Sequence, residues 1–246
     1  MSTFVLVPGA WLGGWCWRAV IPPLRAAGHR VLAPTLTGLA ERAHLLTRET
    51  GLATHVRDVI DVLVTSDLRE VILVGHSYGG TVVSGVAGRV PERLGCLAFL
   101  DGSVPLDGQS NNDALPRDLV ERIRDDARRA GDGWLLPPPP LHDWGLDPEM
   151  QGWVRGRLTP HPLKSLEDPV ALPPGALHPS RRAFLRTSSP SSFYQRFLER
   201  ARDDGWYWRE LAGGHFAMLT APEVVAEALL ELARVCARRE AGSRAG

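Results

Sequence analysis

The sequence has little that would attract a charged polymer or a membrane. Its 246 residues carry 28 Lys and Arg against 28 Asp and Glu, so the net charge is close to zero. A balanced charge gives no electrostatic attraction to nucleic acid or to an anionic membrane surface. No apolar run approaches the ~20 residues that a membrane-spanning helix needs. We therefore expect neither nucleic acid nor a membrane among the partners.

Cysteine is scarce, and signals for export are missing. Cys16, Cys96 and Cys236 are odd in number and far apart, which gives neither a disulfide framework nor metal-ligand spacing. The N-terminal MSTFVLVPGAW has no basic region and no small-residue cleavage site ahead of the first apparent strand. These absences predict buried thiols, no metal and a cytoplasmic location. The oligomeric state stays open, with a homodimer among the alternatives.

Short apolar runs alternate with helical patterns over most of the chain. Runs rich in β-branched residues, each ended by Pro, Gly or a polar loop, predict strands. Apolar spacing of three and four residues between them predicts amphipathic helices. The strands are expected at 4–7, 30–33, 71–74, 97–100, 183–186 and 206–211, and the helices at 54–64, 79–90, 192–202 and 223–235. This alternation indicates an α/β fold, a mostly parallel sheet with helices on both faces.

Residues 103–178 interrupt that alternation. They contain a charged helical pattern at 118–129, four consecutive prolines at 137–140 and three tryptophans, but no strand pattern suited to the sheet. We interpret this segment as an inserted, largely helical cap. The predicted core then consists of residues 1–102 and 179–246.

A serine stands in a glycine-flanked turn between the third strand and its helix. Gly75-His76-Ser77-Tyr78-Gly79 fits the pattern G-x-S-x-G in the strand–turn–helix context that the pattern requires. Such a turn strains the backbone at the serine and favours glycine on either side. It presents the hydroxyl at the top of the sheet, beside the positive end of a helix. The motif predicts a nucleophilic Ser77; a turn that only packs, or that cradles a phosphate, is the alternative.

A serine hydroxyl needs a base, and His215 is placed to supply one. It follows Gly213-Gly214 in the loop between the last strand and the last helix. In this topology an imidazole there reaches the serine, and the chain order of Ser before His also matches. Of the eight histidines, His215 alone combines a glycine-rich loop with that location. We expect His76 to pack or to hydrogen-bond under the turn.

The oxyanion formed by attack of such a nucleophile needs backbone donors. We expect one from the N–H of Tyr78, directly after the nucleophile, and the other from Ala10 in the loop after the first strand. An ordinary turn at Pro8-Gly9 is the alternative for that loop.

These residues resemble the α/β-hydrolase superfamily. The segments PGAWLGGWCW, PTLTGLAERAH, VGHSYGG, LDGSVPLDGQS and GGHFAMLTAPEVVAEAL are similar to small cap-bearing esterases related to plant methylesterases, hydroxynitrile lyases and bacterial pyrethroid-type carboxylesterases. The likeness covers both ends of the chain and matches the cap poorly. It implies an active site between core and cap, a serine nucleophile, a histidine base and no cofactor.

The chain departs from this family at the acid of the catalytic triad. The family's acid follows the strand predicted at 183–186, but residues 187–192 contain no carboxylate. Asp101 ends the strand after the nucleophile helix, an alternative acid position in the superfamily, and we expect it to orient His215. The alternatives are an Asp that caps the turn at Gly102, and a Ser77–His215 dyad helped by a serine or a water.

The resemblance favours ester hydrolysis over other reactions of the superfamily. Related dehalogenases and epoxide hydrolases have Asp as the nucleophile, and the similar hydroxynitrile lyases have Thr where Gly9 stands and Lys where Phe216 stands. We therefore expect acyl transfer through an acyl-enzyme on Ser77. A cofactor-free lyase or cyclase, and a non-catalytic protein that binds a small molecule, are the alternatives.

Tryptophans predict an apolar substrate pocket. Trp11 in the first loop, and Trp134 and Trp144 in the cap, are expected to bind substrate, each with a place in the core as its alternative. The expected partner is a small-molecule ester, for which a methyl or other small alkyl ester of a bulky apolar acid is our hypothesis. Lactones and thioesters stay open.

Overall fold

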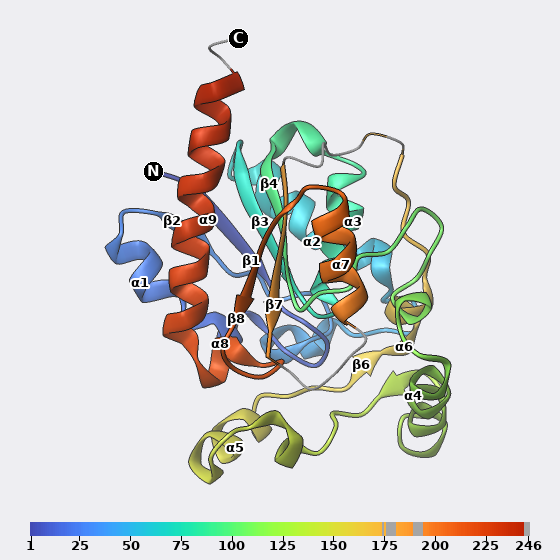
Figure 1. The fold of residues 1–246 in the computed structure, drawn as a ribbon. Coiled ribbons are helices and arrows are strands. Elements are labelled where there is room, and N and C mark those ends of the chain that lie inside the picture. The colour runs from blue at the N-terminus through green and yellow to red at the C-terminus, as the bar shows by residue number, and fades with distance from the viewer. Residues whose placement is uncertain (174, 176–180, 189–193, 244–246) are drawn as a thin grey trace.

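A six-stranded sheet forms the centre of the structure, a computed structural model that describes residues 1–173, 175, 181–188 and 194–243. The strand order is β2-β1-β3-β4-β7-β8, and each of these neighbouring pairs is parallel (Figure 1). The strands are β1 (Thr3–Val7), β2 (Arg30–Leu32), β3 (Val71–His76), β4 (Leu94–Leu100), β7 (Arg182–Thr187) and β8 (Tyr207–Leu211). This arrangement confirms the predicted fold class.

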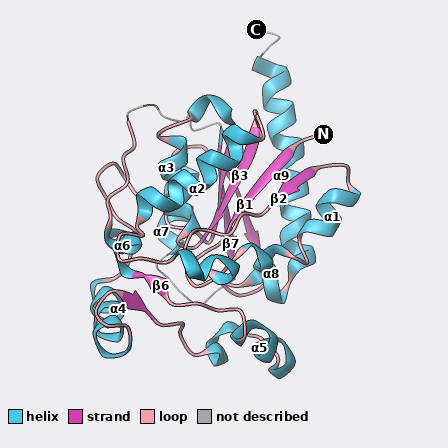
Figure 2. Ribbon diagram, turned by 180° about the vertical axis from the view of Figure 1, so that it is seen from behind, coloured by secondary structure: helices cyan, strands magenta, loops and turns pink. Residues whose placement is uncertain are grey.

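Helices cover both faces of the sheet. On one face lie α1 (Ile21–Ala26), α8 (Ala217–Thr220) and α9 (Pro222–Ser243). On the other lie α2 (Leu52–Thr65), α3 (Gly79–Ala87) and α7 (Gln195–Asp203), and a view from behind shows the same two layers (Figure 2). Short 3₁₀ turns occur at Gly14–Trp17, Ala40–Leu45, Pro91–Arg93, Asn112–Ala114 and Leu141–Trp144.

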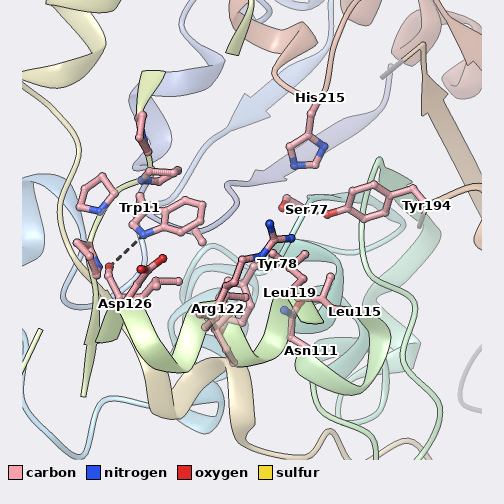
Figure 3. Close-up of a pocket in the computed structure, with 18 residues that line it drawn as sticks. Trp11, Ser77, Tyr78, Asn111, Leu115, Leu119, Arg122, Asp126, Tyr194 and His215 are labelled. Carbon is pink, nitrogen blue, oxygen red and sulfur yellow. Dashed lines mark hydrogen bonds between the residues drawn. The ribbon is translucent and has the colours of Figure 1, made fainter. Parts of the chain in front are cut away.

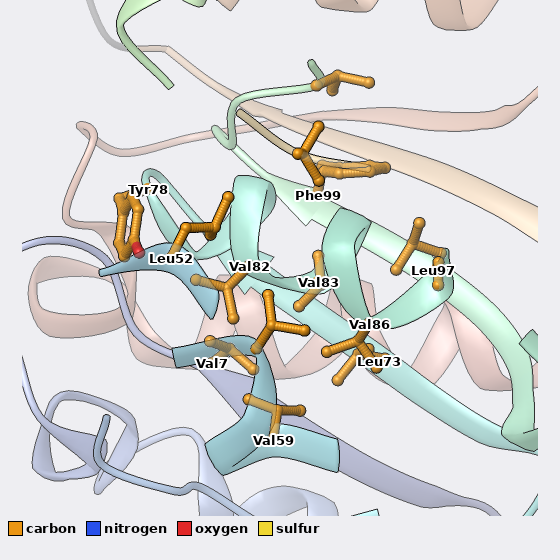
Figure 4. Close-up of a cluster of buried hydrophobic side chains, with 14 of the residues drawn as sticks. Val7, Leu52, Val59, Leu73, Tyr78, Val82, Val83, Val86, Leu97 and Phe99 are labelled. Carbon is orange, nitrogen blue, oxygen red and sulfur yellow. The ribbon is translucent and has the colours of Figure 1, made fainter. Parts of the chain in front are cut away.

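The two layers exist because the strands are apolar on both faces. Val7, Leu73 and Phe99 point to the layer of α2 and α3, where they pack with Val59 and Val83 (Figure 4). The residues between them along each strand point the other way, toward α9. Burying one such side chain contributes about 1.5–3 kcal/mol before entropy is counted.

The register of the strands brings their carboxyl ends to one edge. Val7 pairs with Gly75 and His76 with Leu100. The loops that follow β1, β3, β4 and β8 therefore leave the sheet at the same edge. In open parallel sheets, ligands bind outside this edge.

The chain between β4 and β7 lies against that edge (Figure 1). It contains α4 (Arg117–Ala130), α5 (Pro148–Arg155), α6 (Leu163–Glu167) and a small antiparallel hairpin of β5 (Leu135–Leu136) and β6 (His161–Pro162). Asp168, which follows α6, attaches this segment to the core, since it accepts the Leu52 N–H at the start of α2 at 3.0 Å. The cap boundary expected at residues 178 and 179 lies outside the described residues, so the division into core and cap stays a prediction.

In the part of the chain that the structure describes, no helix combines the length and the apolar character that crossing a membrane requires.

Candidate active site

Ser77 occupies the strained turn that its motif predicts. It joins β3 to α3 with a φ of 52°, a conformation that costs about 1–3 kcal/mol for a residue other than glycine. The flanking glycines are required by space. A Cβ on Gly79 would lie 2.7 Å from the Pro8 carbonyl oxygen, and one on Gly75 would collide with the backbone of Gly79. The turn therefore holds the Ser77 hydroxyl at the carboxyl edge of the sheet.

His215 lies beyond β8, with its imidazole beside the same edge. Its Nδ1 is 3.4 Å from Oδ2 of Asp101. A carboxylate only accepts hydrogen bonds, so Nδ1 carries the proton and Nε2 is left as the basic nitrogen. Figure 3 shows the ring of His215 next to Ser77 at the wall of one cavity, which both residues line. The structure thus brings together two side chains that are far apart in the sequence.

Asp101 is fully buried at the end of β4 and surrounded by donors. Its carboxylate accepts the Thr187 N–H at 2.9 Å, the Thr187 hydroxyl, and an Nη1–H of Arg186 at 3.2 Å. Burial alone raises the pKa of Asp101, but the hydrogen bond and charge of His215 and the two bonds from Thr187 outweigh it and lower the pKa below its usual value. The carboxylate therefore stays ionised beside His215.

The two described residues at the position where the family has its acid donate hydrogen bonds and carry no carboxylate. The described residues there are Thr187 and Ser188, and residues 189–193 lie outside the described part. Thr187 ends β7, and both its N–H and its hydroxyl turn to Asp101 on the neighbouring strand. Sequence reasoning missed this role, because a threonine after a strand carries no signal for it.

His76 is hydrogen-bonded to the loop that carries His215. Its Nε2–H donates to the backbone oxygen of His215 at 2.8 Å. Full burial, followed by the nearby charge of His215, lowers the pKa of His76 to about 3. His76 is therefore neutral, and it packs under the turn as the sequence predicts.

The residues expected to form the oxyanion hole both line the cavity. Ala10 follows β1, and Tyr78 follows Ser77. Among the hydrogen bonds of the described residues, neither backbone N–H has an acceptor. These two donors are therefore available to a ligand.

The loop after β1 is held by the hairpin of β5 and β6. Trp11 has a φ of 64°, and its Nε1–H donates to the Leu136 oxygen at 3.1 Å. Its backbone N–H donates to Nδ1 of His161 at 3.4 Å, and its oxygen accepts the Thr159 N–H at 3.3 Å. Trp11 is thus bonded to the segment that follows β4 through its side chain, its N–H and its carbonyl oxygen, which positions the neighbouring Ala10.

The side chain of Tyr78 is fixed behind the turn. Its hydroxyl donates to Nδ1 of His55 at 2.8 Å, while Nε2–H of His55 donates to the Thr37 oxygen at 2.9 Å. Burial lowers the pKa of His55 to about 4, so this histidine is neutral and can accept from the tyrosine. These bonds fix the side chain of Tyr78, the residue directly after Ser77.

A cavity of about 640 Å³ connects these groups to the segment that follows β4 (Figure 3). Its core side holds Ala10, Trp11, Ser77, Tyr78, Tyr194 and His215. The opposite wall is formed by Asn111, Leu115, Leu119, Arg122, Ile123, Asp126, Leu136, the prolines at 137–140 and Leu166. Leu119 and Ile123 are four residues apart on α4, so the apolar face of that charged helix was the available signal for this wall.

Two of the three tryptophans expected in the pocket lie elsewhere, which is a correction. Trp11 lines the cavity, whereas Trp134 and Trp144 are not among the described residues that do. The ring of Trp134 has the guanidinium of Arg48 5.0 Å from its centre. Trp144 is buried and stacks on Phe216, with ring centroids 3.6 Å apart. Large aromatic rings suit cation–π contacts and core packing as well as a pocket, so a tryptophan in the sequence does not by itself indicate a pocket.

This arrangement places a hydroxyl, an imidazole with an ionised carboxylate behind it, and two free N–H donors around one cavity. Such a set is suited to acyl transfer. The sequence profile of the alpha/beta hydrolase family matches residues 4–228. The chain belongs to the α/β-hydrolase family.

Among members of this family, one curated relative matches over its whole length. The carbendazim hydrolyzing esterase of Nocardioides sp. (strain SG-4G) is 37% identical over 246 residues, which cover 94% of this chain and 100% of the esterase. This relative confirms the resemblance to small esterases and supports classifying this α/β-hydrolase as a carboxylic ester hydrolase.

Solved structures agree on the fold. An extracellular α/β-hydrolase from a Paenibacillus species has a TM-score of 0.82 at 24% identity, with 94% of this chain and 98% of the other covered. Tomato methylketone synthase I, complexed with 2-tridecanone, has a TM-score of 0.77 at 20% identity, with 95% and 98% covered. At these identities the matches show the fold alone.

Proposed function

We propose that this α/β-hydrolase is a serine esterase that cleaves a carboxylic ester through an acyl-enzyme on Ser77. The observation that carries the proposal is the meeting of Ser77, His215 and the buried carboxylate of Asp101 at one edge of the sheet, beside the cavity. A protein that only bound its ligand would have no need for a strained serine beside an oriented imidazole.

In the first half of the reaction, the Ser77 hydroxyl attacks the ester carbonyl while Nε2 of His215 takes its proton. The carbonyl oxygen becomes an oxyanion, which accepts hydrogen bonds from the backbone N–H groups of Ala10 and Tyr78. Asp101 stabilises the imidazolium that forms and keeps Nδ1 directed toward itself. His215 then gives the proton to the departing alkoxide, and an acyl group remains on Ser77.

In the second half, water replaces the alcohol. His215 takes a proton from the water as it attacks the acyl carbon, and the same two N–H donors hold the new oxyanion. When the intermediate collapses, the bond to Ser77 breaks and the free acid leaves. The base, the donors and the carboxylate serve both halves without change of position.

The walls of the cavity favour a bulky apolar acid. Leu115, Leu119, Ile123 and the prolines at 137–140 offer apolar surface opposite the nucleophile. A cavity of about 640 Å³ accommodates far more than an acetyl group. A methyl or other small alkyl ester of such an acid is therefore the proposed substrate class.

We keep a cytoplasmic location as a proposal from the sequence.

A panel of methyl esters tests this function, with acids that increase in size from acetate to bicyclic aromatic acids. Carbendazim is included because the Nocardioides relative is named for hydrolysing it. We expect kcat/KM to rise at least tenfold from acetate to the bulky acids, and Ser77→Ala to lose about three orders of magnitude or more.

Ser66→Ala is the matched control, since Ser66 follows α2 and does not line the cavity. It should retain full activity. Turnover that survives Ser77→Ala, or a protein that hydrolyses none of the esters, would refute the proposal.

A further inference from the structure

Tyr194 is a buried aromatic residue in direct contact with two of the three expected catalytic side chains, those of Ser77 and His215. It precedes α7, and its hydroxyl lies 3.3 Å from Oγ of Ser77. Its ring stacks on the imidazole of His215, with centroids 5.1 Å apart and planes within 15° of parallel. It also lines the cavity (Figure 3). Neither the motif nor the triad accounts for this hydroxyl.

The direction of the Tyr194–Ser77 hydrogen bond follows from the chemistry of its neighbours. Ser77 has one hydroxyl proton, and the proposed mechanism gives it to His215. The tyrosine must then be the donor to Oγ. Burial raises the pKa of Tyr194 well above its usual value, so the phenol keeps its proton throughout.

The position of Tyr194 separates it from the oxyanion hole. The donors Ala10 and Tyr78 come from the loops after β1 and β3. Tyr194 and His215 come from the loops after β7 and β8, on the other side of Ser77 in the order of the strands. In a tetrahedral intermediate, the group opposite the oxyanion donors and next to the base is the leaving oxygen.

We propose that Tyr194 is a catalytic residue that donates a hydrogen bond to the leaving-group oxygen, beside the proton that His215 delivers. The inference rests on the proposed esterase function. The leaving oxygen and Oγ are bonded to the same carbon, so a donor in contact with one is within reach of the other. As the intermediate collapses, the bond from carbon to the leaving oxygen breaks, and its electron pair goes to that oxygen. The proton comes from Nε2 of His215, and Tyr194 retains its own.

This role predicts a dependence on the leaving group. An alkoxide is strongly basic and develops much negative charge, which a donor stabilises. A 4-nitrophenolate leaves with little help, because the charge spreads into the ring. Loss of the donor must therefore slow the alkyl ester more than the nitrophenyl ester of the same acid.

Tyr194→Phe removes the hydroxyl and keeps the ring that stacks on His215. The purified variant is assayed with the ethyl ester and the 4-nitrophenyl ester of one aromatic acid. We expect kcat/KM for the ethyl ester to fall about 10- to 100-fold, and that for the 4-nitrophenyl ester by less than about threefold. An equal loss on both esters, or no loss on the ethyl ester, would overturn the proposal.

The ratio between the two esters decides the result even if the variant folds poorly, since a smaller folded fraction lowers both rates equally. Tyr194→Leu serves as a comparison because it removes the hydroxyl and the stacked ring together, and both esters should then lose rate. Failure of the esterase proposal is recognised separately: the wild-type protein would hydrolyse neither ester, or Ser77→Ala would retain activity.

Discussion

Replacing Asp101 by Asn removes one negative charge from behind the base and preserves the shape of the side chain. The carboxylate is 3.4 Å from Nδ1 of His215, and at an effective dielectric constant of about 20 it stabilises an imidazolium there by about 5 kcal/mol. At about 1.36 kcal/mol for each factor of ten, the expected loss in kcat is about three to four orders of magnitude. The Asn side chain can still accept the Thr187 N–H, so the local structure should persist.

The assay measures kcat and KM of the variant with the best ester of the panel, together with thermal unfolding. KM should change little, because Asp101 does not line the described cavity. Asp113→Asn is the matched control: its carboxylate accepts hydrogen bonds from Ser110 in a local turn, and the change should leave kcat within about threefold.

A folded Asp101→Asn protein that keeps kcat within about tenfold would refute the electrostatic reasoning, which requires a larger loss. In that case a Ser77–His215 dyad would describe the enzyme better, and Asp101 would be a residue that only caps its turn.

Three further changes test the supports of the site. Thr187→Val removes the hydroxyl donor to Asp101 and should lower the free energy of unfolding by about 1.5–3 kcal/mol at pH 7 in urea titrations. Because the pKa of Asp101 is lower in the folded than in the unfolded state, this difference should be lost as the pH falls below about 4; a difference that does not vary with pH contradicts the assignment. Trp11→Phe removes the bond to the Leu136 oxygen and should lower kcat/KM about tenfold for every ester of the panel, by loosening an oxyanion donor; an unchanged rate would show that the loop needs no such bond. Acidification should destabilise the fold, because His55 and His76 have folded-state pKa values of about 4 and about 3, below the unfolded value of 6.5. Below pH 6.5 the unfolded chain gains protons on these histidines and the folded protein does not. Each histidine should therefore lower the free energy of unfolding by about 2 kcal/mol between pH 7 and pH 5. Equal stability at the two pH values would be inconsistent with buried neutral imidazoles.

The parts of this protein that local sequence predicts are those with a local physical cause. Strands such as β3 are short apolar runs that end in a turn, and helices such as α2 carry apolar residues at helical spacing. The turn at Ser77 needs glycine two residues before and two residues after it. A stretch of five residues therefore predicts both the backbone turn and the position of its hydroxyl. The position of Asp101 followed from topology, because parallel strands end at one edge.

The parts that escaped prediction depend on partners distant in the sequence. Trp134 and Trp144 are large apolar residues of one segment, and composition alone does not say whether such a ring meets a cavity, a guanidinium or another ring. The contact of Tyr194 with Ser77 joins the loops after β7 and β3, two strands with β4 between them in the sheet. The hydrogen bonds of Thr187 to Asp101 likewise join neighbouring strands whose pairing no single stretch of sequence specifies.

Capture of the covalent intermediate is the most direct measurement of the central claim. The protein is mixed with a 4-nitrophenyl ester, quenched in acid within the first turnover and digested, and the peptides are weighed by mass spectrometry. The proposed mechanism predicts one acyl group on the peptide that contains Ser77, and no adduct in Ser77→Ala. An acyl group on another residue, or full turnover by Ser77→Ala without any adduct, would contradict it.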